Sequence, residues 1–312
     1  MAASLLQAAS SHATYRRFRL LRECLGALSV VAGGACVLTL DIFVVLYQRK
    51  PEDSETLTTL SRIDFLSLGF DVECHIWDNA ASVSAPPEQG FLPFKWRYIS
   101  SRDNEPLSKV YNALISDTIG SLIIIFDQDS LVDESFFRSL AKSTLSICAD
   151  VFVPVIKHDG YVISPGRLRW IKGAPLHHLS LNTMLPRHFT AMMSGLCIER
   201  SFLLRLGSKP FDERLRFYGV DTRFCRDLAI NGGRAYVHDA VLGHDSALRS
   251  VTDSRAALDR QIWLWQSWLR VFDRNAAEVI AIRCYVLWKV WCTSWRQRMA
   301  VRFRELVVEV FR

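Results

Sequence analysis

Two carboxylates stand directly after the most apolar stretch of the chain. Asp127 and Asp129, separated by Gln128, follow residues 122–126, which are all Leu, Ile or Phe. Side chains two residues apart in an extended chain point to the same side, and open α/β sheets bind ligands where their strands end. Carboxylate oxygens suit hard cations such as Mg²⁺ or Mn²⁺, which often bridge to substrate phosphates. The triplet is therefore a candidate metal and phosphate site, and an ordinary acidic turn after a buried strand is the alternative.

Two later positions could also take part in chemistry. Asp221 follows Gly219 and Val220 in the first turn of an expected helix. It is either a general base that takes a proton from a hydroxyl group or an acid that the helix macrodipole favours. His244 comes after an expected strand. A single histidine at such a place is either a metal ligand or a hydrogen-bonded structural residue.

The elements that would position these residues alternate between strands and helices. We expect strands at residues 42–47, 72–77, 95–99, 122–126, 150–156 and 235–241, and helices at 107–115, 134–144, 199–206 and 220–231. Ser54 is a candidate cap for an earlier helix. Continuous apolar runs such as residues 42–47 are typical of strands buried on both faces of a parallel sheet. The alternation predicts an α/β fold.

One long segment departs from this alternation. Residues 157–187 are rich in Gly, Pro and His. We expect an irregular segment here, since such long loops in compact domains are usually functional or disordered. It is a candidate acceptor loop or lid, with no role assigned to His177, His178 or Arg187.

Composition excludes several classes of protein. The 312 residues are 50% apolar and 22% charged, which excludes a disordered chain. The net charge of +6, from 38 basic and 32 acidic residues, is too small an excess to indicate nucleic-acid binding. The eight cysteines form no CxxC pair, so neither a zinc site nor a disulfide framework is indicated. Free thiols in a reducing compartment are expected, which favours a cytoplasmic location.

The two ends of the chain differ from its middle, so three parts are expected: a lead-in at residues 1–40, a catalytic domain at 41–252 and a tail at 253–312. The apolar run at residues 25–40 has about sixteen residues, whereas a membrane span needs roughly 20. We therefore expect an amphipathic or poorly ordered lead-in, with a membrane span or signal peptide as alternatives. The tail combines six Trp with many Arg and is helical in pattern. Its helix pair either lies at a membrane interface or packs its tryptophans onto the catalytic domain.

The ordered set of polar features resembles the family 2 glycosyltransferases with a GT-A fold. The features are, in chain order, the strand ending at Tyr47, the pair Asp78-Asn79, residues 107–112, 126–129, 194–198, 211–213 and 218–221, and His244. Within that family the chain is most similar to rhamnosyltransferase-like members of bacterial polysaccharide synthesis. The resemblance covers residues 41–250 and rests on the whole series. It implies a GT-A fold, an α/β fold with a mostly parallel central sheet, here followed by C-terminal helices.

The resemblance implies a donor site at the carboxyl ends of the first strands. The loop after Tyr47 and the carboxylate of Asp78, with Asn79 beside it, would hold the base and ribose of the donor. Lys109 and Asn112, on the helix after the third strand, would approach the diphosphate, where a cation is electrostatically favourable.

The resemblance also implies a metal site and a catalytic base. Asp127 would contact the ribose or the metal, Asp129 would ligate Mg²⁺ or Mn²⁺ directly, and His244 would supply a further ligand. Asp221 falls on the last acid of the family's Glu-Asp pair, which is the catalytic base of inverting members. Val220 replaces the preceding acid, which puts acceptor recognition in doubt and leaves the base in place.

The implied activity is transfer of a sugar, by closest resemblance rhamnose, from a dTDP- or UDP-linked donor. The acceptor would be a hydroxyl of a glycan or lipid-linked glycan, and peripheral contact with the cytoplasmic face of the inner membrane would follow. Two alternatives remain open. One is a haloacid-dehalogenase-type phosphatase with Asp127 as nucleophile. The other is a non-catalytic, membrane-associated scaffold, suggested by Val220 and the aromatic tail.

Overall fold

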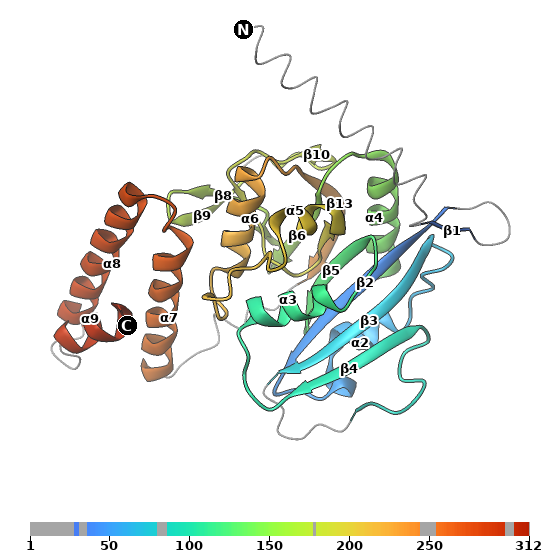
Figure 1. The fold of residues 1–312 in the computed structure, drawn as a ribbon, viewed down its shortest axis with the longest axis horizontal. Coiled ribbons are helices and arrows are strands. Elements are labelled where there is room, and N and C mark those ends of the chain that lie inside the picture. The colour runs from blue at the N-terminus through green and yellow to red at the C-terminus, as the bar shows by residue number, and fades with distance from the viewer. Residues whose placement is uncertain are drawn as a thin grey trace, which may run out of the picture.

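The computed structural model describes residues 28–30, 36–79, 86–176, 179–243, 254–296 and 303–311. Its centre is a ten-stranded sheet in the order β10-β13-β6-β12-β5-β2-β3-β4, with β1 beside β2 and β7 beside β6 (Figure 1). The strands of this sheet are β1 Leu28–Val30, β2 Cys36–Tyr47, β3 Phe70–Asn79, β4 Lys95–Ser101, β5 Leu122–Asp127, β6 Val151–His158, β7 Tyr161–Ser164, β10 Thr183–Met184, β12 Leu196–Glu199 and β13 Ala235–Gly243. The helices are η1 Pro51–Asp53, α2 Glu55–Leu60, α3 Leu107–Ser116, α4 Glu134–Ser146, α5 Arg200–Leu206, α6 Val220–Ile230, α7 Ser254–Val271, α8 Ala276–Arg296 and α9 Phe303–Phe311.

The long neighbouring strands β2, β3, β4 and β5 pair in parallel, as the apolar runs predict. Strand β2 pairs in parallel with β3 and β5, β3 with β4, and β6 with β13. Strand β12 lies between β5 and β6 and is antiparallel to both. The carboxyl ends of β2, β3 and β5 therefore meet at one edge of the sheet, where ligands bind in open α/β folds.

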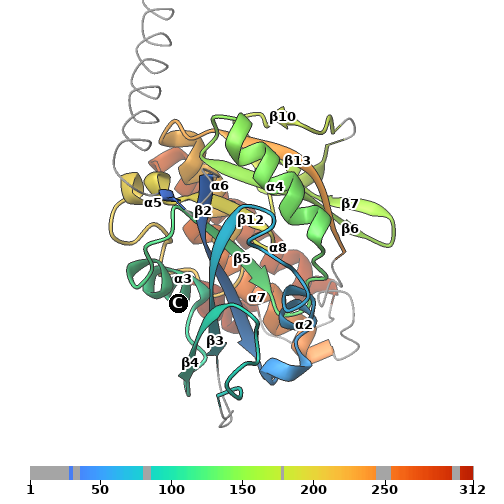
Figure 2. The same cartoon turned by 90° about the vertical axis from the view of Figure 1, so that its right-hand side faces the viewer.

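Hydrophobic side chains cover both faces of the sheet. Leu40, Ile42 and Val44 of β2 belong to one buried cluster, whereas Phe43 of the same strand belongs to the other. Figure 2 shows the sheet between helices on its two sides. Burial on both faces explains the continuous apolar runs at residues 42–47 of β2 and 122–126 of β5.

The first strands are longer than their apolar runs. Strand β2 starts at Cys36, inside the segment expected to be a lead-in, and β3 extends to Asn79. Both differences arise from parallel pairing, because Leu38 lies opposite Phe70 and Tyr47 lies opposite Asn79. The polar residues at the ends of β2 and β3 therefore remain paired within the sheet, although hydropathy alone would exclude them from the strands. Ser54 caps α2 as predicted, since its hydroxyl accepts a hydrogen bond from the backbone of Leu57.

The prediction of an irregular segment at residues 157–187 is wrong. Strand β7 pairs with β6, and β8 Gly166–Arg169 pairs with β9 Lys172–Pro175 and β11 Phe189–Thr190 in a separate three-stranded sheet. These strands have at most four residues each. Such lengths are too short to produce a hydrophobic pattern, and pairing with neighbours holds them instead. His177 and His178 lie outside the described residues.

The tail contains three described helices where a pair was expected, and it shares the core of the catalytic domain. Trp265 of α7, Val286 of α8 and Leu306 of α9 are at most 1% exposed and belong to the same cluster as Phe224 of α6. Trp265 is buried in the core, as one of the two alternatives for the tail predicts, whereas Trp263, Trp288, Trp291 and Trp295 are exposed. Within the described ranges no helix is long and apolar enough to cross a membrane.

Ion pairs also join the tail to α6. Asp227 of α6 accepts hydrogen bonds from Arg223 at 3.1 Å and from Arg274 at 2.7 Å. Arg223 in turn contacts Asp273 at 2.9 Å, and Arg226 donates to both oxygens of Glu278. All of these side chains are at most 30% exposed, so solvent screens them less than a surface pair.

We expect the Asp227→Ala variant to unfold at a lower temperature than the wild type. Removing the carboxylate leaves Arg223 and Arg274 without their shared acceptor, which costs on the order of 1.5–3 kcal/mol per lost hydrogen bond to a charged group. Thermal unfolding followed by circular dichroism measures the change. Asp117→Ala, at an exposed carboxylate, is the control. Equal melting temperatures for the two variants would show that the network adds little.

Candidate donor and catalytic site

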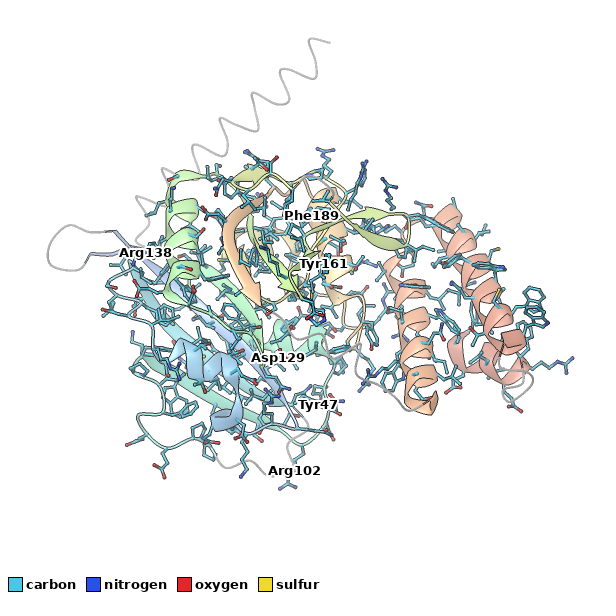
Figure 3. The ribbon with its side chains drawn as sticks, turned by 180° about the vertical axis from the view of Figure 1, so that it is seen from behind. Tyr47, Arg102, Asp129, Arg138, Tyr161 and Phe189 are labelled. Atoms are coloured by element: carbon cyan, nitrogen blue, oxygen red, sulfur yellow. The ribbon has the colours of Figure 1, made fainter. Side chains whose placement is uncertain are left out.

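The edge formed by β2, β3 and β5 carries the polar residues that the sequence singled out. Tyr47 ends β2 and is half-exposed, and Asp127 ends β5 and is half-buried. The backbone N–H of Tyr47 donates to the side-chain oxygen of Gln128 at 2.8 Å. Tyr47 and Asp129 are labelled near each other, close to the middle of the molecule, in Figure 3. The structure thus brings the donor-loop candidate and the acidic triplet together.

The acidic triplet is fixed by residues that the sequence did not indicate. The backbone N–H of Ser130 donates to the Thr56 hydroxyl at 2.8 Å, and that hydroxyl lies 2.5 Å from the carbonyl oxygen of Asp127. Ser54 donates to the carbonyl of Gln128 at 2.8 Å. The start of α2 therefore holds the turn in one conformation.

A second contact comes from the far side of the turn. The hydroxyl of Ser194 lies 2.6 Å from that of Ser130 and accepts a hydrogen bond from the backbone of Asp127 at 3.3 Å. Asp129 is half-buried, and its Oδ1 atom is shielded from solvent. Two carboxylates on a fixed turn, one with a buried oxygen, form a set of hard oxygen donors suited to Mg²⁺ or Mn²⁺.

Asp78 and Asn79 are buried at the end of β3 and already have protein partners. The hydroxyl of Tyr98 donates to the Asp78 carboxylate at 2.6 Å. The Asn79 amide accepts from the backbone N–H of Glu105 at 2.9 Å and donates to its carbonyl, also at 2.9 Å. Asn79 therefore shapes the loop that precedes α3. Donor binding by Asp78 and Asn79 stays a prediction.

The two candidates on α3 have different surroundings. Lys109 is exposed, and its ammonium group lies 4.0 Å from Glu105. Asn112 is buried, accepts from the backbone N–H of Phe211 at 3.0 Å and donates to the carbonyl of Phe211 at 2.9 Å. Its amide also lies 3.2 Å from Glu213. The geometry leaves Lys109 accessible to a diphosphate and gives Asn112 a positioning role for the 211–213 turn.

We expect Asn112→Ala to destabilise the protein more than it weakens donor binding. The substitution leaves the buried backbone groups of Phe211 without a partner, at a cost of about 1–3 kcal/mol for each unsatisfied group. Thermal unfolding and nucleotide affinity are measured on the same preparation. Lys109→Ala provides the contrast, because it is expected to weaken nucleotide binding without lowering the melting temperature. A strong loss of affinity with unchanged stability would restore Asn112 as a donor ligand.

Asp221 lies in the first turn of α6, as predicted, and is partly accessible. Its Oδ1 atom accepts from the backbone N–H of Thr222 at 2.6 Å. Burial raises the pKa of Asp221, and the hydrogen bonds from Thr222 oppose that rise. A carboxyl group with a raised pKa is suited to proton transfer.

Tyr111 connects the two acidic sites. Its side chain is buried on α3, and after burial itself the negative charges of Asp127 and Asp221 raise its pKa further. Both carboxylates are therefore near enough to influence the same hydroxyl group electrostatically, and a single site formed by the triplet and Asp221 stays a prediction.

Packing explains the residues on either side of the candidate base. Gly219 has a φ of +82°, and a Cβ there would lie 2.8 Å from Val271 of α7. Val220 is 4% exposed and belongs to the core cluster. An acid at position 220 would therefore be buried among apolar side chains, which accounts physically for its absence.

His244 lies outside the described residues, but the chain before it is placed. Gly243 ends β13 and forms an antiparallel bridge with Leu131. Leu131 is two residues beyond Asp129. Gly243 therefore lies beside the chain that follows the acidic turn, and metal ligation by His244 stays a prediction.

A second group of possible metal ligands lies on the same strands, nearer their starts. Asp41, Glu73 and His75 offer ligand atoms within 4.8 Å of one another. His75 contacts Asp41 at 3.2 Å, the backbone of Gly120 donates to Asp41 at 2.7 Å, and Arg97 pairs with Glu73 at 2.5 Å. This group is a charge network with protein partners throughout, six residues along β2 from Tyr47.

Comparison with known proteins identifies the fold. No family sequence model matches the chain, and no curated protein sequence matches it. Among solved structures, GalNAc-T7 with UDP, GalNAc and Mn²⁺ superposes with a TM-score of 0.54 at 15% identity, covering 86% of this chain and 52% of that chain. The chain thus spans about half the length of GalNAc-T7.

Two shorter relatives are covered more completely. The mannosyltransferase PcManGT from Pyrobaculum calidifontis, in complex with GDP-Man and Mn²⁺, gives a TM-score of 0.53 at 15% identity, over 96% of this chain and 88% of that chain. Residues 1–349 of S. aureus TarS with UDP-GlcNAc give 0.50 at 15% identity, over 80% and 72%. The chain has the GT-A fold of these glycosyltransferases, as the sequence resemblance implied.

Proposed function

We propose that this protein is a glycosyltransferase that moves a sugar from a nucleoside diphosphate to a hydroxyl group. The observation that carries the proposal is the acidic turn of Asp127 and Asp129, which Ser54, Thr56 and Ser194 contact at the carboxyl edge of a GT-A sheet. The negative charges of Asp127 and Asp221 both raise the pKa of the buried Tyr111, which supports placing the candidate base in the same site. Open α/β sheets bind their ligands at this edge.

The donor set supports a divalent cation as cofactor. Asp127 and Asp129 would hold Mg²⁺ or Mn²⁺ through oxygen atoms, with His244 as the further candidate ligand. GalNAc-T7 and PcManGT both contain Mn²⁺ in their structures. When bound, such an ion neutralises charge on the diphosphate leaving group.

The residues of this chain then divide the work of the transfer. Lys109, exposed on α3, would add positive charge beside the diphosphate. The Asp221 carboxylate would take the proton from the acceptor hydroxyl while the oxygen of that hydroxyl attacks the anomeric carbon. Attack from the face opposite the leaving group makes a single displacement, which inverts the anomeric configuration.

The narrower assignments follow from the sequence resemblance. We propose a dTDP- or UDP-linked donor, with rhamnose as the sugar, and a glycan or lipid-linked glycan as acceptor in cell-surface polysaccharide synthesis. The neighbouring structures contain UDP, UDP-GlcNAc or GDP-Man, which supports a nucleotide-sugar donor in general. A location on the cytoplasmic face of the inner membrane suits a lipid-linked acceptor.

The test is a hydrolysis screen of nucleotide sugars with and without Mn²⁺. We expect slow, metal-dependent release of a nucleoside diphosphate from one donor, because a bound donor is activated even without an acceptor. The screen includes dTDP-rhamnose, UDP-GlcNAc and GDP-mannose. If no donor is bound or consumed, the transferase proposal fails and the scaffold alternative gains.

A further inference from the structure

One face of α8 is apolar and open to solvent over most of the helix. Its exposed apolar side chains recur every three or four residues, so they lie on one side of the helix. They are Ile280, Leu287, Trp288, Trp291 and Trp295, each between 38% and 76% exposed, with the exposed Cys284 among them. We call this set the α8 face. The opposite side, with Ile282, Val286 and Val290, is buried in the core.

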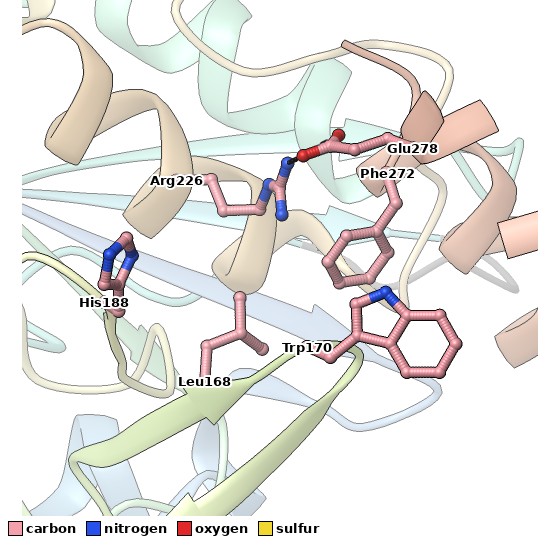
Figure 4. A pocket seen from close by; sticks show the side chains of 6 residues that line it. All are labelled: Leu168, Trp170, His188, Arg226, Phe272 and Glu278. Atoms are coloured by element: carbon pink, nitrogen blue, oxygen red, sulfur yellow. Dashed lines mark hydrogen bonds and ion pairs between the residues drawn. The ribbon is translucent and has the colours of Figure 1, made fainter. Parts of the chain in front are cut away.

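This distribution is unusual for the outer side of a helix in a globular protein. Such helices place polar side chains outward, and exposed tryptophans normally occur singly. The face also extends beyond α8, because Trp170 on the β8–β9 hairpin packs against Tyr285 at 5.2 Å, and Tyr285 packs against Trp288 at 5.6 Å. Figure 4 shows Trp170 below Phe272 and Arg226, and these residues of the hairpin, the tail and α6 line one pocket.

The charged residues of α8 beyond its first turn are all positive. Arg283 is exposed, and the ammonium group of Lys289 lies 5.3 Å from the centre of the Trp288 ring. Residues 279–296 contain no Asp or Glu. Tryptophan with flanking Lys and Arg is the composition of helices that lie in the headgroup region of a bilayer.

The charge pattern distinguishes a bilayer from a second copy of this chain. Pairing two α8 faces would bring Arg283 and Lys289 against the same residues of the partner, with no acid on the helix between 279 and 296 to neutralise them. Lipid phosphates would instead complement these charges. Since no described helix can cross a membrane, the helix would lie along the surface.

We propose that the α8 face docks this protein on an anionic bilayer surface. Tryptophan side chains would enter the headgroup region, while Arg283 and Lys289 would contact lipid phosphates. The inference goes beyond the transfer reaction and does not depend on it. Docking through the tail would hold the catalytic domain, which shares its core with α8, at the bilayer surface.

The test is co-sedimentation of the full chain with lipid vesicles. We expect strong binding to vesicles of phosphatidylcholine with phosphatidylglycerol, weaker binding to phosphatidylcholine alone, and a loss of the difference at high salt. The Trp291→Glu/Trp295→Glu variant should bind at least about tenfold more weakly. Arg283→Gln/Lys289→Gln should lose about fivefold per charge on anionic vesicles only.

Matched controls change exposed residues outside the tail. Ile119→Glu changes a side chain that is 92% exposed, and Arg138→Gln removes an exposed charge on α4, far from α8 in Figure 3. Both should bind vesicles like the wild type. If the Trp291→Glu/Trp295→Glu variant fails to fold, binding of the Arg283→Gln/Lys289→Gln variant to anionic vesicles still tests the proposal.

Three results would overturn the proposal. They are equal binding of the wild type to neutral and anionic vesicles, undiminished binding of the α8 variants, and a wild-type dimer in light scattering that the α8 variants abolish. Nucleotide binding is measured in parallel, because vesicle binding without nucleotide binding would refute the transferase and leave the docking surface intact.

Discussion

The Asp221→Asn variant is expected to lose sugar transfer almost completely while still binding the nucleotide. A positioned general base contributes about 10²–10⁴ to a rate, so the rate should fall by that factor. The asparagine oxygen can still accept the hydrogen bond from the Thr222 backbone at 2.6 Å, so the turn keeps its geometry. Transfer rate and nucleotide affinity, measured on the same protein, separate loss of chemistry from loss of binding.

The pH dependence supplies a second readout for the same residue. Burial raises the pKa of Asp221, and only the deprotonated carboxylate can accept a proton. The wild-type rate should therefore rise with pH through a pKa above that of an ordinary aspartate and then level off. The residual rate of Asp221→Asn should lack this rise.

The stability of the folded protein gives an independent check, because the rise in pH that increases the transfer rate should lower the contribution of Asp221 to stability. Because the pKa is raised in the folded state, the folded protein holds the proton more tightly than the unfolded chain does. That contribution to stability is complete at low pH and is lost as pH rises through the raised pKa. At neutral pH, Asp221→Asn should consequently melt at the wild-type temperature or above it. The control is Asp117→Asn, which changes an exposed acid. If Asp221→Asn transfers sugar at the wild-type rate, Asp221 is not the catalytic base.

The fold could largely be predicted because its central strands are apolar on both faces. The apolar runs in β2 and β5 indicated buried strands, and Ser54 indicated the start of α2. The hairpins at residues 161–175 were missed because each strand has four residues and their stability comes from pairing. The third tail helix, α9, was missed because the composition of the tail predicts only one pair of amphipathic helices.

The site was predictable only where acids follow strands or begin helices. Asp127, Asp129 and Asp221 stood out for that reason. Thr56 and Ser194, which fix the acidic turn, lie 71 and 67 residues from Asp127 in the chain. No local pattern marks such partners. The same holds for the buried contacts of Asn112 with Phe211, which span 99 residues, and donor binding by Asn112 stays a prediction.

Asp127→Asn separates the transferase from the phosphatase alternative. As a nucleophile, Asp127 would be essential, and phosphatase activity with any substrate would vanish in the variant. As a donor contact, the residue would only weaken nucleotide binding, because the asparagine keeps one oxygen. The GT-A fold and the two β-α units before β5 favour the second outcome.

Removing Asp129 is expected to abolish the dependence of nucleotide binding on metal. In the wild type, UDP or dTDP should bind with higher affinity when Mn²⁺ is present, and a chelator should reverse the effect. The Asp129→Asn variant would lose the carboxylate that we propose as a direct metal ligand. Since even outer-shell changes cost about 10–100-fold in metal affinity, the loss should be at least of that order. Calorimetry with nucleotide and Mn²⁺, added together and separately, measures both affinities.

Asp133→Asn is the matched control, because it removes one negative charge from the same loop. Asp133 caps α4 by accepting from the backbone N–H of Phe136 at 3.0 Å, and asparagine caps a helix equally well. Nucleotide binding by the Asp133→Asn variant should depend on Mn²⁺ as strongly as binding by the wild type does. If Asp129→Asn behaves in the same way, the carboxylate is an acidic turn residue and the metal is held elsewhere. If the wild type itself binds nucleotide equally with and without Mn²⁺, the turn between β5 and α4 is no metal site, and the proposed leaving-group stabilisation would rest on Lys109 alone.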